Sequence, residues 1–88
     1  MISKTYIIKG ADGIHARPAT ALVRLVKQYK SSFMMKKGDK SIALNSMLNI
    51  LSFGAVGGDS VTIDIVGEDE TEASKAIELF FTEVLNKL

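Results

Sequence analysis

The chain has 88 residues, of which 47% are hydrophobic and 24% are charged, with 11 basic against 10 acidic side chains. A chain of this length supports one hydrophobic core, so we expect a single domain over residues 1–88. The balanced charge is typical of a globular protein and indicates no polyanionic partner.

Several classes of site are excluded by the composition. No cysteine is present, which excludes disulfides, thiolate metal sites and cysteine nucleophiles, and a single histidine excludes a multi-histidine metal site within the chain. No stretch is apolar enough for a signal peptide or a membrane span. We therefore expect a cytoplasmic protein with no metal, no cofactor and no membrane insertion.

The first half of the chain predicts a strand, a helix and a hairpin. A β-prone run over residues 6–8 ends at Gly10. A helix is expected from residue 16 to about residue 29. Its apolar residues recur at helical spacing at Ala19, Leu22, Val23 and Val26. Strands around residues 33–35 and 42–44 should follow, joined by a two-residue turn in KGDK.

The second half predicts a short helix, a strand and a long helix. NSMLNILSFG should be helical, with Asn45 or Ser46 as cap and Gly54 as stop. Alternating apolar residues indicate a half-buried strand from Ser60 to Val66. A last helix should run from about residue 69 to residue 88, opening on a capping-box spacing at Asp69 and Glu72. Its expected inner face consists of Ala73, Ala76, Ile77, Phe80 and Val84.

This order of elements predicts an α+β protein. The three amphipathic helices would cover one face of a four-stranded, mainly antiparallel sheet. The other face of the sheet would be open to solvent.

The stretch GIHARPAT, residues 13 to 20, holds the only histidine and the only proline of the chain. If the first helix begins near residue 16, His15 lies at its N-cap and Pro18 in its first turn. Free backbone N–H groups and the Arg17 guanidinium would then favour an anion beside a nucleophilic imidazole. His15 is thus a candidate covalent phosphoryl carrier. The alternative is a surface histidine beside an ordinary helix-starting proline.

GIHARPAT, followed some thirty residues later by LNSMLNILSFG, resembles the phosphocarrier protein HPr of the bacterial phosphoenolpyruvate-dependent sugar phosphotransferase system. The resemblance implies the HPr-like open-faced β-sandwich. It also implies that His15 takes a phosphoryl group on Nδ1 from phosphorylated enzyme I and passes it to IIA components of sugar transporters, assisted by Arg17. The chain would then be a covalently phosphorylated carrier and not an enzyme.

The resemblance also implies a docking surface beside the histidine. It would combine a polar stripe on the first helix with an apolar patch on the second: Thr20, Arg24, Lys27, Met47, Leu48 and Leu51. Such a surface suits several acidic partners by turn, and a carrier that docks them successively is most simply a monomer. The alternative is that the three apolar residues belong to the core, to which we assign Ile50.

Ser46 is the second candidate site. The resemblance implies phosphorylation of this serine by HPr kinase/phosphorylase, which hinders transfer through the histidine and creates a corepressor for a catabolite-control transcription regulator. The alternative is a simple N-cap serine. Asn45, Met47 and Asn49 depart from the residues that commonly surround this serine, which puts recognition by the kinase and the regulator in doubt.

Two other departures concern the first helix and the loop before it. Asp12 puts a carboxylate near His15, where it could orient the loop or repel phosphate. Leu25 and Val26 make the first helix more apolar than is usual in the family.

Two other functions are compatible with the pattern. The first is an HPr-like regulatory paralogue that binds transcription factors or enzymes in carbon catabolite control, against which the retained histidine argues. The second is a nucleic-acid binder on the sheet, which the lack of aromatic residues from Ser60 to Val66 disfavours. We expect no direct nucleic-acid partner.

Overall fold

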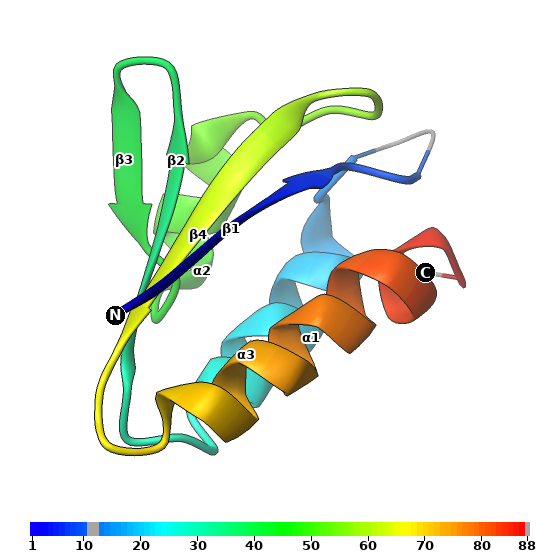
Figure 1. Cartoon of the computed structure of the whole chain (residues 1–88). Helices are drawn as coiled ribbons and strands as arrows, with labels where there is room; N and C mark the ends of the chain where they lie inside the picture. The colour runs from blue at the N-terminus through cyan, green and yellow to red at the C-terminus, as the bar shows by residue number, and fades with distance from the viewer. Residues whose placement is uncertain (11–12, 88) are drawn as a thin grey trace.

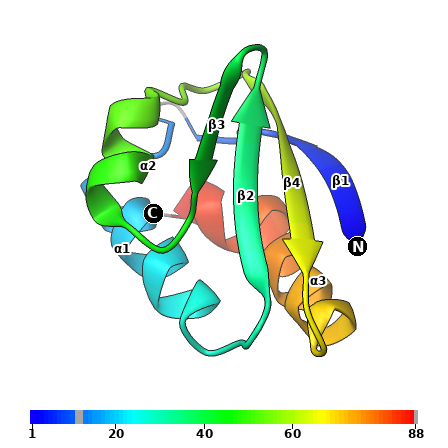
Figure 2. The same ribbon diagram turned by 90° about the vertical axis from the view of Figure 1, so that its left-hand side faces the viewer.

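The computed structural model describes residues 1–10 and 13–87 and places four strands in one sheet with three helices on one face (Figure 1, Figure 2). The elements in chain order are β1 (Ile2–Ile7), α1 (Ala16–Val26), β2 (Ser32–Lys37), β3 (Lys40–Ala43), α2 (Met47–Phe53), β4 (Ser60–Val66) and α3 (Glu70–Leu79). A π-helical turn (Phe80–Val84) and a 3-10 turn (Leu85–Lys87) extend α3. The predicted α+β class and order of elements are confirmed.

The sheet has the strand order β1-β4-β2-β3, and every neighbouring pair is antiparallel. β4 spans the predicted residues and alternates as expected. Its buried residues are Val61, Ile63 and Ile65. On the opposite, open face Asp64 pairs with Lys36, and this hydrogen bond lowers the pKa of the Asp64 carboxyl. The helices therefore cover only the apolar side of the sheet.

The core lies between the sheet and the helices. Its fully buried side chains include Leu22 from α1, Ile50 from α2 and Ile77 from α3. The assignment of Ile50 to the core is thus confirmed. Tyr6 of β1 stacks on Phe81 with ring centroids 5.1 Å apart, which joins the edge strand to the π-helical turn that follows α3.

Turn and cap residues act as the sequence predicts in the middle of the chain. Gly38 has a φ of 58° in the two-residue turn between β2 and β3. Ser46 is the N-cap of α2, and Gly54, with a φ of 75°, ends that helix. Leu44 lies outside β3, contrary to expectation, but it is buried and its N–H donates to the Phe33 carbonyl at 3.0 Å.

Three further element boundaries differ from the predictions. β1 ends at Ile7, and the buried Ile8 follows it. α1 ends at Val26, because the N–H groups of residues 28 and 29 bond to carbonyls three positions back and tighten the chain into a turn. The last helix is interrupted after Leu79 by the π-helical turn, which buries both Phe80 and Phe81. Residue 88 lies outside the described part of the chain.

The capping box expected at Asp69 and Glu72 is wrong. Asp69 is the N-cap residue of α3, but its carboxylate makes no capping bond within the described residues. It instead accepts hydrogen bonds from the Ser31 hydroxyl at 2.6 Å and from the N–H groups of Lys30 and Ser31 at 2.7 and 3.0 Å. A tertiary contact has therefore replaced the local one, and it ties α3 to the loop between α1 and β2.

This contact predicts a pH-dependent loss of stability. The Ser31 hydroxyl first, and then the Lys30 N–H, hold the pKa of Asp69 below its ordinary value of 3.8. A depressed folded-state pKa stabilises the protein above the unfolded value, and the contribution is lost as pH falls through the folded value. We expect Asp69→Asn to have a lower free energy of unfolding than the parent at pH 7. At pH 3 the two free energies should be nearly equal, and urea denaturation measures both.

The matched control is Asp39→Asn, because Asp39 lies in the exposed β2–β3 turn. The free energy of unfolding of this variant should equal that of the parent at both pH values. A deficit of Asp69→Asn that is equally large at pH 7 and pH 3 would contradict the ionic role of Asp69.

Candidate functional site

The candidate site is built around His15, which is the N-cap residue of α1. Its backbone is extended, with φ −95° and ψ −163°, and its carbonyl accepts a 2.9 Å hydrogen bond from the Ala19 N–H. The side chain is partly exposed and makes no capping hydrogen bond to any residue that the structure describes. The imidazole therefore lies at the N-terminus of α1 but does not cap the helix.

The first turn of α1 leaves backbone donors beside this ring. Ala16 and Arg17 are the first two helical residues, and their N–H groups have no carbonyl one turn earlier within the helix. Pro18 follows as a buried residue whose missing N–H removes no helical bond here. No acidic residue occupies this turn. No acidic side chain of the first turn therefore compensates the positive end of the helix dipole beside the imidazole.

Three exposed cations lie along α1 or at its C-cap. The described residues form no ion pair with Arg17, Arg24 or Lys27, all of which are exposed. The acidic side chains of the ion pairs that do form contact lysines of the sheet and loops or the chain's first amino group, as in Lys37–Asp59 at 2.7 Å. A shallow groove of 320 Å³ lies along α1 from Ala16 and Arg17 to Arg24. An anion would meet unpaired positive charge along this face.

A backbone contact that the sequence did not reveal holds His15 in place. The Ile14 N–H donates to the Ala55 carbonyl at 3.2 Å. Gly13 has a φ of 66°, and a Cβ at this position would collide with the same carbonyl oxygen. Glycine is therefore required by both conformation and space. The sequence signalled this contact only through the last glycine of the GADG loop. Ala55 lies about forty residues further along the chain, so no local pattern predicts the contact.

α1 and α2 lie side by side at the site (Figure 2). The Thr20 hydroxyl donates to the Ala16 carbonyl at 2.9 Å and contacts the Met47 sulfur at 3.7 Å. Leu48 and Leu51 are 74% and 44% exposed, so assigning them to the core is wrong, whereas Met47 is half-buried against it. The structure thus places five of the six predicted docking residues on the adjoining helices α1 and α2, and Lys27 at the C-cap of α1.

Ser46 caps α2 through its own hydroxyl, which accepts from the Asn49 N–H at 3.3 Å. The Asn49 amide donates in turn to the Ala43 carbonyl at 3.4 Å, which gives this departure from the family pattern a structural role. Asp12, the other residue of interest near His15, lies outside the described residues. Across residues 1–10 and 13–87 there is no cluster of three histidine, cysteine or acidic residues suited to a metal ion. In the same ranges, no helix has the length and apolarity needed to cross a membrane.

Comparisons with known proteins identify the family of the chain. The family model described as the PTS HPr component phosphorylation site matches residues 2–83. HPr from Thermoanaerobacter tengcongensis is 36% identical over 94% of this chain and 98% of that one, with a TM-score of 0.84. The histidine-containing phosphocarrier protein of Mycoplasma is 26% identical over 99% and 100% of the two chains, with a TM-score of 0.90.

A third similar structure is Crh, the catabolite-repression protein of Bacillus subtilis, described as a swapped dimer. It is 26% identical over 94% of this chain and 95% of that one, with a TM-score of 0.75. The matches share one fold, and the family model spans nearly all of the sequence, the histidine-bearing turn included. The chain therefore belongs to the HPr family, the phosphocarriers of the phosphotransferase system.

Proposed function

We propose that residues 1–88 form one HPr domain that acts in the cytoplasm as a phosphocarrier. It takes a phosphoryl group on His15 from phosphorylated enzyme I and passes it to the IIA components of sugar transporters. The observation that carries this proposal is the partly exposed imidazole at the N-terminus of α1, which does not cap the helix and is followed two residues later by Arg17, whose side chain is exposed and forms no ion pair with any described residue.

The transfer requires one nucleophilic atom and groups that bind the negatively charged phosphoryl oxygens. The Nδ1 lone pair of His15 forms the new nitrogen–phosphorus bond while the phosphoryl bond to the donor breaks. The phosphoryl oxygens then face the free N–H groups of residues 16 and 17 and the Arg17 guanidinium, which can form paired hydrogen bonds with them. The same steps in reverse order deliver the group to the acceptor. The chain is thus a covalent intermediate and not a catalyst.

Docking follows from the helices that flank His15. Thr20, Arg24 and Lys27 present polar and positive groups on α1, and Met47, Leu48 and Leu51 present apolar surface on α2; we call these six residues the docking surface. A partner with acidic and apolar groups would be attracted and oriented by it. We expect the carrier to work as a monomer, because the donor and the acceptors need the same surface free in turn.

Phosphorylation of Ser46 by HPr kinase/phosphorylase would regulate the carrier through this surface. Phosphate at the N-terminus of α2 is electrostatically compatible with the helix, so the fold would persist. Up to about two negative charges would be added beside Met47 and would repel acidic partners. The modified carrier could also bind a catabolite-control transcription regulator.

A second candidate function is that of a regulatory paralogue, and the likeness to Crh favours it. Such a protein would bind transcription factors or enzymes of carbon catabolite control and would carry little sugar flux. Retention of His15 at the opening of α1 argues against this function. Capture of regulators without any IIA component from cells of the source would favour the paralogue.

His15→Ala should abolish formation of an acid-labile phosphoryl adduct, because no other imidazole is present in the chain. The measurement is the intact mass after reaction with phosphoenolpyruvate and enzyme I, before and after acid treatment. Ser46→Ala is the control and should keep the adduct. A label that persists in His15→Ala would refute the assignment.

Arg17 and Arg24 should differ in how their loss affects transfer. Arg17→Ala removes a charge-assisted hydrogen bond to the moving phosphoryl group, so kcat should fall about 10- to 100-fold. Arg24→Ala removes a rim charge and should raise KM with little change in kcat. Steady-state transfer from phosphorylated enzyme I measures both, and equal effects on kcat would show that Arg17 is only a docking residue.

Ser46→Asp should raise the KM for phosphorylated enzyme I while α2 remains folded, because aspartate caps a helix and adds negative charge. Ser46→Ala should instead leave KM unchanged and lower the free energy of unfolding by about 1 kcal/mol, through loss of the cap. Transfer kinetics and urea denaturation separate the two. Unchanged kinetics in Ser46→Asp would argue against regulation by charge.

A further inference from the structure

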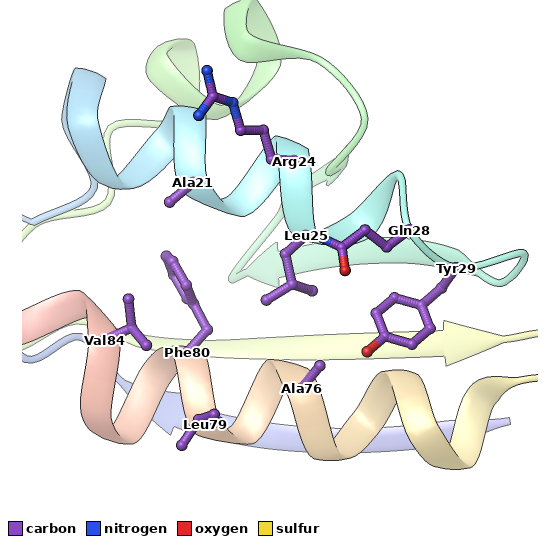
Figure 3. Close-up of a pocket in the computed structure, with 9 residues that line it drawn as sticks. All are labelled: Ala21, Arg24, Leu25, Gln28, Tyr29, Ala76, Leu79, Phe80 and Val84. Carbon is purple, nitrogen blue, oxygen red and sulfur yellow. The ribbon is translucent and has the colours of Figure 1, made fainter.

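A groove of 390 Å³ lies between α1 and α3, and Figure 3 shows it with the sheet behind. Leu25 and Tyr29 line it from the side of α1, and Ala76, Leu79, Phe80 and Val84 line it from the side of α3 and its extension. The groove is therefore mostly apolar. Its size falls in the range of clefts that bind ligands or partner side chains.

The fold does not require all of this apolar surface. α1 already supplies Leu22, Val23 and Val26 to the core, each less than 10% exposed. Leu25 is only half-buried, and Leu79 is 57% exposed at the edge of the groove. Leu25 and Leu79 therefore leave apolar surface that a partner side chain can cover.

The groove is continuous with the surface around His15. Ala21 and Arg24 line both this groove and the shallow groove that begins at Ala16 and Arg17. In Figure 3 the Arg24 guanidinium points away from α3. Arg24 therefore contributes its charge to the docking surface and also lines the apolar groove. A partner group that reached Arg24 would lie beside the opening of the groove.

The groove lies close enough to His15 for a protein bound at His15 to contact it. Ten residues of helix separate His15 from Leu25, which is about 15 Å along the axis. A typical interface buries about 800 Å² on each partner, and a circular patch of that area has a radius of about 16 Å. The footprint of a partner centred on His15 therefore extends to the α1–α3 groove.

We propose that this groove is an anchoring site for the proteins that exchange the phosphoryl group with His15. It would receive one apolar side chain from a partner surface that also presents carboxylates to Arg24 and to its neighbour Lys27. The docking surface would then extend past α1 onto α3. This inference rests on the proposed phosphocarrier function.

The test is Leu79→Ser in transfer from phosphorylated enzyme I. Leu79 is exposed, so its replacement should leave the fold intact, which thermal unfolding checks. We expect KM to rise about fivefold with kcat unchanged, because the variant loses binding that is equal in the ground and transition states. Ala76→Leu, which fills the groove from α3, should raise KM in the same way.

The matched control is Val66→Ser, because Val66 is 50% exposed on β4. Its KM and kcat should equal those of the parent. A KM of Leu79→Ser and Ala76→Leu within twofold of the parent would overturn the anchoring site while the parent's phosphorylation of His15 still supports the carrier. If the parent takes no label, both proposals fall. A concentration-dependent dimer that Leu79→Ser dissociates, with unchanged KM, would assign the groove to a second copy and also overturn the proposal.

Discussion

The contact between the loop of Gly13 and Ile14 and the carbonyl of Ala55 determines where the histidine stands. It joins the chain just before α1 to the chain just after α2, so the two helices that flank the site are held at a shared point. A side chain at residue 13 would occupy the space of the Ala55 backbone. Together with the contact between Thr20 and Met47, it holds the start of α1 beside α2.

The cations of α1 differ from several lysines of the sheet and loops in their partners. Lys4, Lys30, Lys36 and Lys37 are paired with carboxylates, whereas Lys9 and Lys40 form no ion pair with any described residue. Within the ranges that the structure describes, the cations of α1 lack such partners. Exposed ion pairs contribute little to stability, but they neutralise the surfaces they occupy. Arg17, Arg24 and Lys27 therefore place positive charge without a described ion-pair partner along one helix, next to His15.

Local patterns predicted most of the fold because they are enforced by local physics. The alternation from Ser60 to Val66, the turn at Gly38 and the N-cap at Ser46 depend on side-chain periodicity, backbone conformation and a bond three residues away. Predictions failed where a distant residue competed for the same group. Asp69 had the spacing of a capping box, but Ser31 and the backbone of Lys30 bind its carboxylate instead. The last helix changed to a π-helical turn where Phe80 and Phe81 both enter the core.

By itself, the sequence determined the α+β class, the start of α1 at residue 16 and the presence of His15, Arg17 and Pro18 in one helical turn, since all of these depend on neighbours along the chain. Only the tertiary structure decided that Leu48 and Leu51 are exposed while Met47 is half-buried, because burial depends on how α2 packs against α1 and the sheet. The same holds for the groove between α1 and α3, whose walls are fifty residues apart in sequence and meet only because both helices cover the same face of the sheet.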